Sequence, residues 1–297
     1  MKVAVTGASG FVGARLCERL HDAGHGVRRL VRRAPQAPDE VRWDPKTGEV
    51  DLEGLAGVEG VVHLAGENIA GGRWTAARKQ RLRDSRVEGT TTIARALAKL
   101  DPQPAVLVSA SAIGIYGSRG DERLAESSSD GDDFLAKLCK DWEAAAEPAR
   151  EAGIRVAHPR IGLVLHKSGG ALGKMLLPFK MCLGGPLGDG SHWMSWITRE
   201  DLCSLLITML EDERYEGPIN AVAPGAVTNR DFTKALGRAL GRPAIIPMPA
   251  FQVRFLFGEM GEALLLGSQR VEPQRALERD FPFSATDIDA GLAAALA

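Results

Sequence analysis

The sequence carries almost no net charge and contains no long hydrophobic run. Its 37 lysines and arginines balance 38 aspartates and glutamates over 297 residues, which leaves a formal net charge of −1. Because proteins that bind nucleic acid through bulk electrostatics carry a basic excess, we expect no nucleic-acid partner. No apolar segment approaches membrane-spanning length, and the N-terminal residues lack the pattern of a signal peptide. We therefore expect a cytoplasmic protein with no membrane partner.

Cysteine and histidine are scarce and unpatterned. The four cysteines form no CxxC pair, so we expect reduced thiols. The six histidines have no metal-ligand spacing, so we expect no metal site. No G-x-S-x-G motif is present, which excludes the hydrolases that use this turn. The apolar fraction of 44% and the charged fraction of 25% are those of an ordinary globular protein, long enough for an α/β domain with a smaller lobe.

An apolar strand followed by evenly spaced glycines opens the chain. Residues 3–5 are a short buried run, and from Phe11 the apolar residues recur at helical spacing. A strand, a glycine turn and a helix in this order are typical of a dinucleotide-binding unit. The first glycine allows the sharp turn, the second lets a pyrophosphate approach the backbone, and the third lets helix and strand pack closely. The predicted phosphate-binding turn comprises Gly7, Ser9, Gly10, Phe11, Val12 and Gly13.

Two arginines end the second predicted strand. NAD-binding units carry an Asp or Glu about 20 residues after the glycines, where it holds the ribose 2′-hydroxyl. The corresponding position here is Arg32, followed by Arg33. A guanidinium can hold a phosphate with its planar fork, which predicts a preference for NADP(H). The alternative is a solvated basic strand end.

Strands and helices alternate over the first half of the chain. This alternation predicts a doubly wound parallel Rossmann sheet of the α/β class. Beyond Gly169-Gly170 the alternation stops and Gly and Pro punctuate the sequence, which indicates a smaller mixed lobe over the strand ends, mostly helical toward the C-terminus. We predict an NADP(H)-binding domain over 1–165 and a substrate lobe over 166–297. The predicted strands cover 3–5, 27–31, 41–45, 60–65 and 106–108 and begin again at 154; the predicted helices cover 10–23, 75–100, 132–152, 199–210, 229–240 and 249–266.

Several motifs together resemble the extended short-chain dehydrogenase/reductase superfamily. They are Thr6–Gly13, His63–Gly66, Tyr116-Gly117, Pro159–Gly162 and Trp196–Leu202. Further segments resemble the epimerase-family group of atypical extended members, also labelled sugar-nucleotide epimerase-like or cell-division-inhibitor-like. These are Leu64–Ile69, Asp133–Lys137 through Trp142-Glu143, and Leu176–Phe179. The resemblance covers essentially the whole chain. It implies an NADP(H)-binding fold with a C-terminal substrate lobe, and no particular substrate.

The same resemblance places further cofactor contacts at strand ends. The end of the fourth predicted strand passes beneath the cofactor, and Arg86 points to it from the following helix unless it forms a surface ion pair. The serine-rich end of the fifth strand and the end of the sixth complete the site. The expected contacts are Leu64, Ala65, Gly66, Glu67, Arg86, Ser109, Pro159 and Ile161.

The superfamily's catalytic Tyr-x-x-x-Lys pair is missing. In that pair the lysine lowers the tyrosine pKa from about 10. The chain has only two tyrosines, and neither is followed by lysine four residues later. Alignment on Trp142-Glu143 puts Leu135 and Cys139 in the two positions, while other registers pair Asp133 with Lys137 or Ala136 with Lys140.

The nearest replacements by chain position are Ser111 and Tyr116, with Lys137 as the cation. Each has a structural alternative: a serine bonded to its own backbone, a packed aromatic and a solvated lysine.

Two functions fit these observations. The first is an NADP(H)-dependent oxidoreductase or epimerase that acts on a small polar or sugar-nucleotide substrate through non-standard proton-transfer groups. The second is an NADP(H)-binding redox sensor or regulatory protein with little or no turnover. The glycine turn fits both, the missing pair favours the second, and the large C-terminal lobe favours the first. The oligomeric state stays open, with a homodimer as one alternative.

Overall fold

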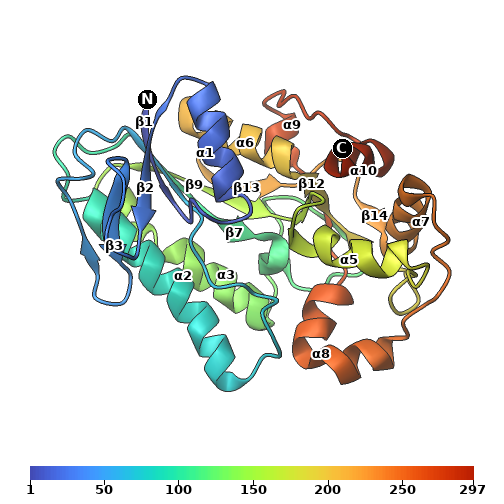
Figure 1. Cartoon of the computed structure of the whole chain (residues 1–297). Helices are drawn as coiled ribbons and strands as arrows, with labels where there is room; N and C mark the ends of the chain where they lie inside the picture. Colours follow the sequence, from blue (N-terminus) through green and yellow to red (C-terminus); the bar gives the residue numbers. More distant parts are fainter.

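The structure is a computed structural model that describes residues 1–297, built around one nine-stranded sheet (Figure 1). The strand order is β13-β9-β6-β5-β1-β2-β3-β4, with β7 beside β9, and all pairings are parallel except that of β3 with β4. The strands are β1 (Lys2–Thr6), β2 (Gly26–Val31), β3 (Glu40–Asp44), β4 (Glu49–Val50), β5 (Gly60–His63), β6 (Val106–Ser109), β7 (Ser111–Ala112), β9 (Arg155–Ile161) and β13 (Gly217–Ala221).

The strand order reverses direction at β1. The chain first builds outward through β2 and β3 and then returns through β5 to the other side of β1. In open parallel sheets the crevice at such a switch point, at the carboxyl ends of the strands, is the usual ligand site. The order confirms the predicted doubly wound Rossmann sheet.

Helices cover both faces of the sheet (Figure 1). The helices α1 (Gly13–Asp22) and α6 (Arg199–Glu211) pack together on one face. The opposite face carries α2 (Ala76–Leu97), α3 (Phe134–Ala144) and α4 (Glu147–Glu151). Alternate residues of β1 serve the two cores, because Val3 and Val5 belong to the first and Ala4 to the second. Burial on both faces explains why this strand is a continuous apolar run.

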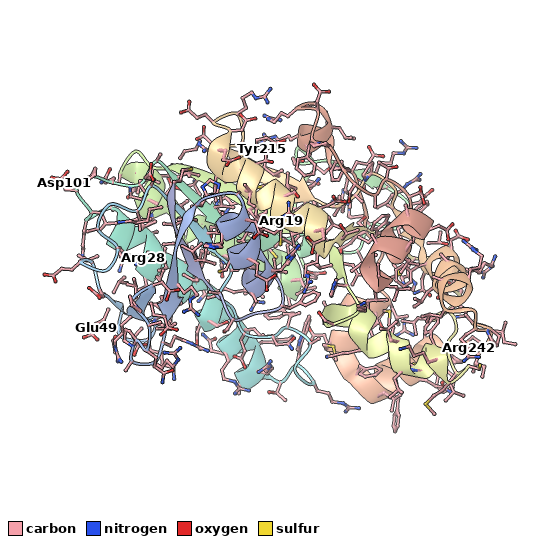
Figure 2. All side chains as sticks on the ribbon, turned by 45° about the horizontal axis from the view of Figure 1, so that its top comes forward. Arg19, Arg28, Glu49, Asp101, Tyr215 and Arg242 are labelled. Atoms are coloured by element: carbon pink, nitrogen blue, oxygen red, sulfur yellow. The ribbon has the colours of Figure 1, made fainter.

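The C-terminal half adds a lobe at one end of the sheet, and Figure 2 shows Arg242 of this lobe at the end opposite to Arg28 and Glu49. Its core contains Trp196, Phe232 and Leu292, all fully buried. None of the helices has both the length and the apolar composition that crossing a membrane requires. The lobe and its connections comprise η1 (Ile113–Tyr116), β8 (Arg123–Leu124), β10 (Leu163–Leu165), α5 (Gly170–Lys180), β11 (Trp193–Met194), β12 (Trp196–Thr198), β14 (Val227–Thr228), α7 (Asn229–Leu240), α8 (Ala250–Leu265), β15 (Arg270–Val271), α9 (Gln274–Leu277) and α10 (Ile288–Leu296).

Three sequence expectations need correction. The helix predicted over 132–152 is two helices, because Pro148 has no N–H to continue the hydrogen bonds of α3 and fits instead in the first turn of α4. The strand predicted over 60–65 ends at His63. The alternation also continues beyond 169, since α6 returns the chain to β13, which joins the sheet beside β9.

Candidate functional site

Glycines shape the turn between β1 and α1. Gly7 has a φ of +67°, and a Cβ on it would lie 3.0 Å from the backbone carbon of Leu64. A Cβ on Gly13 would lie 2.1 Å from the carbonyl oxygen of Gly7, so no other residue allows this packing of helix on turn. Gly10 is exposed, and the only atom within 4 Å of a Cβ there is the same oxygen, at 3.1 Å. The turn therefore presents bare backbone to solvent at Gly10.

The start of α1 is left open for an anion. Its N-cap residue, Val12, makes no side-chain capping bond, and the first turn contains no acidic residue. The N–H groups of Phe11 and Val12 make no hydrogen bond within the protein, and Ser9 is exposed beside them. In contrast, α2, α3 and α6 each begin with a Thr or Asp side chain that accepts a helix N–H. Free N–H groups at the positive end of a helix dipole can bind a phosphate.

Thr6 joins the ends of the two strands that flank the crevice. Its hydroxyl oxygen accepts hydrogen bonds from the N–H groups of Leu64 and Ala65, both at 3.1 Å. The same oxygen lies 2.7 Å from Nδ1 of His63, which is fully buried. Burial lowers the pKa of His63 to about 4, so the ring is neutral. Because the Thr6 oxygen already accepts two N–H bonds, the Thr6 hydroxyl donates its own proton to Nδ1. This bond set fixes the segment that follows β5 beside the glycine turn.

The segment after β5 emerges into solvent at Gly66. Leu64 and Ala65 are half-buried, whereas Gly66 is exposed. The Glu67 N–H donates to Oγ of Ser85 at 3.1 Å, and the Glu67 carboxylate pairs with Arg78. The predicted cofactor segment is therefore anchored to α2 at Glu67.

The two arginines after β2 have different surroundings. Arg33 donates to the Glu40 carboxylate at 2.7 and 2.6 Å, and this fork lowers the pKa of Glu40 to about 2. Arg32 is exposed and makes no hydrogen bond or ion pair. Of the pair, Arg32 is thus the guanidinium that is free to take a ligand.

A buried polar network lies behind the ends of β7, β9 and β13. Arg160 donates to the Glu143 carboxylate at 2.9 and 3.0 Å, and Ser111 donates to the same carboxylate at 2.7 Å. Arg160 also donates to the Tyr116 hydroxyl at 3.0 Å, which in turn donates to Asn220 at 2.7 Å. Burial is the largest single effect and would raise the pKa of Glu143, but the hydrogen bonds and charge of Arg160, together with smaller effects that include the bond from Ser111, lower that pKa overall.

The network changes the interpretation of Tyr116. Its side chain is 0% exposed and packs with Ile113, Ile115 and Cys139. Burial raises its pKa, which is the opposite of what an acid–base group at neutral pH requires. The geometry favours the packing alternative for Tyr116 over a catalytic role.

In the alignment on Trp142-Glu143, the α3 face that would carry the Tyr/Lys pair is occupied by Leu135 and Cys139. A Cβ on Gly114 would lie 3.3 Å from Cβ of Leu135 and 3.8 Å from Sγ of Cys139, so both positions face η1. Burial raises the pKa of Cys139 to about 12. Lys137 lies on the exposed side of α3, and its ammonium makes no hydrogen bond or ion pair. Lys137 is two residues from Leu135 and two from Cys139, and residues two apart on a helix point in different directions. Because Leu135 and Cys139 face η1, which contains Tyr116, the predicted action of Lys137 on the buried Tyr116 has no support in this arrangement.

The remaining predicted contacts lie at or inside the strand ends. Ser109 ends β6, is fully buried, and has no partner for its hydroxyl. Pro159 is buried within β9, between β7 and β13, whereas Ile161 at the strand end is half-buried. Ser111 is 1% exposed. The structure thus brings the strand-end residues to one edge of the sheet, with the side chain of Pro159 enclosed.

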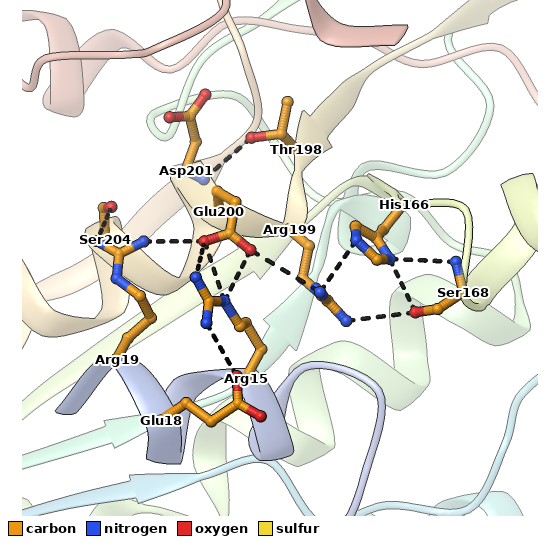
Figure 3. A network of polar contacts seen from close by, with 10 residues as sticks. All are labelled: Arg15, Glu18, Arg19, His166, Ser168, Thr198, Arg199, Glu200, Asp201 and Ser204. Carbon is orange, nitrogen blue, oxygen red and sulfur yellow. Dashed lines mark hydrogen bonds and ion pairs between the residues drawn. The ribbon is translucent and has the colours of Figure 1, made fainter. Parts of the chain in front are cut away.

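A second polar network, unexpected from the sequence, links α1 to α6 and α6 to the segment before α5 (Figure 3). Glu200 accepts from Arg15 at 2.9 Å and from Arg19 at 3.1 Å. Arg199 lies 3.0 Å from Nε2 of His166, which precedes α5. Its guanidinium carbon is also 5.5 Å from the ring centre of Phe11 in the glycine turn. The partners are far apart in the sequence, so no spacing pattern could reveal them.

A cleft of about 880 Å³ opens in the lobe. It lies between the segment that follows η1, the loop before β11, and α8. Its charged and polar lining includes Asp121, Asp189, His192, Arg254 and Glu262.

The family model of the NAD dependent epimerase/dehydratase family matches residues 3–221. The chain belongs to this family. Its resemblance to the epimerase-family group of extended short-chain dehydrogenases/reductases is thereby confirmed. A second model, for a domain of unknown function, matches residues 248–295 of this epimerase-family chain.

Two relatives that match over nearly their whole length are both named epimerase family proteins. The epimerase family protein Mb2239 of Mycobacterium bovis is 44% identical over 277 residues, which cover 93% of this chain and 91% of the relative. The human epimerase family protein SDR39U1, solved with NADPH, superposes with a TM-score of 0.91 at 35% identity and with 99% coverage of both chains. A nucleoside-diphosphate sugar epimerase of Corynebacterium glutamicum, 39% identical with a TM-score of 0.82, matches 99% of this chain and 58% of its own.

Proposed function

We propose that this epimerase-family protein binds NADP(H) in the crevice at the carboxyl end of β1. The observation that carries the proposal is the open start of α1, where the N–H groups of Phe11 and Val12 are free above the bare backbone of Gly10. A pyrophosphate satisfies such donors and the helix dipole together. The NADPH bound by the human relative SDR39U1 supports this cofactor for a chain of the same fold and length.

The guanidinium of Arg32, which has no partner in the protein, supports NADP(H) over NAD(H). Because Arg33 is held by Glu40, Arg32 supplies the free planar donor after β2. No carboxylate stands at this position to hold a ribose 2′-hydroxyl, and a guanidinium there suits a 2′-phosphate.

The proposed reaction is hydride transfer to or from a small polar or sugar-nucleotide substrate, as in an oxidoreductase or epimerase. Bound NADP(H) supplies the hydride donor or acceptor. The relative named as a nucleoside-diphosphate sugar epimerase supports a sugar nucleotide. Ser111 is the proton-transfer candidate that the structure links to an ionised carboxylate, through its 2.7 Å bond to Glu143.

A second function rests on a specific observation. In the alignment on Trp142-Glu143, Leu135 and Cys139 fall at the positions of the missing Tyr/Lys pair, and the Tyr116 hydroxyl is buried in the core. This lack of a conventional acid–base pair favours an NADP(H)-binding regulatory protein with little or no turnover.

One assay separates the two functions. Purified protein is mixed with NADPH or NADP⁺ and with panels of nucleotide sugars, aldehydes and ketones, and absorbance at the nicotinamide band is followed. Catalytic change in that band with one class of compound supports the enzyme. Tight NADPH binding without turnover on any panel supports the regulatory function, and no NADPH binding contradicts both.

A further inference from the structure

The exposed apolar side chains of this protein gather in two segments of the lobe. Of the eleven large apolar side chains that are exposed in the whole chain, eight lie in residues 177–183 and 245–256. Single exposed apolar residues are normal on a soluble domain, whereas a cluster of them marks an interaction surface. We call the surface formed by these two segments the α5/α8 face.

The helical geometry turns these side chains away from the core. On α5, Phe179 is buried, whereas Leu177, two residues earlier, is 67% exposed. On α8, Val253 is fully buried, whereas Phe251 and Phe255 on either side of it are 68% and 78% exposed. Because residues two apart on a helix point in different directions, each helix packs on the lobe through one side and presents an apolar side to solvent.

Hydrogen bonds hold the two segments beside each other. The Ile246 N–H donates to the Gly184 carbonyl at 3.1 Å, and the Met248 N–H donates to the Pro186 carbonyl at 2.9 Å. The chain that leads into α8 is thereby fixed along the chain that leaves α5, and Figure 1 shows both helices in the same part of the lobe. The exposed apolar residues of the two segments therefore belong to one surface.

Carboxylates are missing from the chain that builds this face. Residues 170–188 and 232–258 contain no Asp or Glu, although the whole chain has 38 acidic residues. The acidic residues of α8, Glu259 and Glu262, come after this stretch, and each forms an ion pair with a cation. The α5/α8 face thus carries no free negative charge from its own segments.

Unpaired cations lie among the apolar groups. Lys174 and Lys180 are one turn before and one turn after Leu177 on α5, and Arg242 stands three residues before Ile245. All three cations are exposed and form no ion pair, and Figure 2 shows Arg242 at the outer end of the lobe. Such a surface fits an anionic partner. A second copy of the chain fits poorly, because a two-fold interface would bring this face and its cations against themselves.

We propose that the α5/α8 face docks the protein on an anionic phospholipid surface. Apolar side chains that project from a helix enter the boundary between headgroups and acyl chains, and the lysines and arginine around them meet the lipid phosphates. We expect no membrane partner from the absence of a spanning segment, but docking of this kind needs no such segment. The inference does not depend on the proposed cofactor.

Cosedimentation of the purified protein with lipid vesicles tests the proposal. The probes are vesicles of phosphatidylcholine alone and vesicles that also contain the anionic phosphatidylglycerol. We expect at least about tenfold tighter binding to the anionic vesicles, and this preference should shrink as salt is added. Lys174→Glu/Lys180→Glu should weaken binding to them at least about tenfold by reversing the charge. Phe251→Gln/Phe255→Gln should weaken it at least about tenfold by removing two inserted rings.

Two matched controls make the same kinds of change elsewhere. Lys46→Glu/Lys99→Glu reverses two exposed lysines that form no ion pair, and Leu277→Gln removes an exposed apolar side chain of α9. Both should bind within about twofold of the wild-type protein, because distant surface charges are screened. Circular dichroism checks that every variant is folded. If the phenylalanine variant is not folded, the lysine variant decides the test.

Three results would overturn the proposal. They are absence of vesicle binding by the wild-type protein, equal binding to both kinds of vesicle, and equal effects of the face variants and their controls. Sedimentation velocity without lipid tests the other occupant of the face. A wild-type dimer that Phe251→Gln/Phe255→Gln converts to a monomer would assign the face to a second copy of the chain and overturn the proposal as well.

Discussion

The guanidinium of Arg160 donates two hydrogen bonds, of 2.9 and 3.0 Å, to the carboxylate of Glu143. This pair joins β9 to α3 beneath the proposed site. Both side chains are largely buried, at 7% and 16% exposure. The carboxylate is thereby kept ionised at the point where Ser111 donates to it at 2.7 Å.

Removing the carboxylate should cost much of the stability of the fold. Glu143→Ala leaves the Arg160 charge buried and unpaired, so we expect the free energy of unfolding to fall by about 3–5 kcal/mol in urea denaturation. Glu147→Ala removes an exposed partner of Arg150 and should cost less than about 1 kcal/mol. Equal small losses of unfolding free energy in both variants would show that the buried pair stabilises the fold no more than an exposed pair does.

Substitutions of Ser111 and of Tyr116 should have different effects on turnover. With a substrate found in the panel assay, we expect Ser111→Ala to lower NADPH-linked turnover at least about tenfold, because a positioned proton-transfer group is lost. Tyr116→Phe should keep turnover within about twofold and lose about 1–2 kcal/mol of stability, since its hydroxyl bonds only Arg160 and Asn220. Initial rates at saturating NADPH decide the point. The reverse pattern would make Tyr116 the catalytic group.

Stability should fall as the pH drops from 7 to 5, in part because of His63. Burial lowers the pKa of His63 from 6.5 to about 4. Between these two pH values the histidine binds a proton in the unfolded chain and stays neutral in the folded protein. The contribution is complete above about pH 6.5 and is lost as the pH falls toward 4, which amounts to about 2 kcal/mol by pH 5.

The check is the difference in unfolding free energy between pH 7 and pH 5. His63→Asn should reduce this difference, whereas His21→Asn, at an exposed position on α1, should leave it unchanged. An undiminished difference in His63→Asn would mean that other groups carry the pH dependence.

Substitutions of Gly10 and of Gly13 should affect different properties, cofactor binding and stability respectively. Gly10→Val should keep the fold and abolish NADPH binding, because Gly10 is exposed and its side chain would fill the phosphate site. Gly13→Val should unfold or strongly destabilise the protein, because a Cβ there would lie 2.1 Å from a carbonyl oxygen. Circular dichroism and NADPH fluorescence measure the two outcomes. A folded Gly10→Val variant with normal affinity would remove the turn from the cofactor site.

Local patterns predicted the sheet and the glycine turn, because both depend on residues that are neighbours in the sequence. Residues 3–5 and the glycine spacing are local patterns that were enough to predict β1 and the start of α1. The division at residue 165 stays a prediction.

The buried networks could not be predicted in this way. Glu143 meets Ser111 only after three segments converge at the sheet edge, and Arg15 meets Glu200 across 185 positions. The different surroundings of Arg32 and Arg33 depend on Glu40, which no spacing rule connects to them. Such contacts are set by tertiary structure.

The binding of NADP(H) through Arg32 is tested most directly by the dissociation constants of NADPH and NADH for the wild-type protein and for Arg32→Ala. A charge-assisted hydrogen bond contributes about 1.5–3 kcal/mol, so the substitution should weaken NADPH binding roughly ten- to a hundredfold and leave NADH binding nearly unchanged. The wild-type protein should bind NADPH more tightly than NADH. Wild-type protein that prefers NADH, or a variant with equal losses for both cofactors, would contradict the assignment.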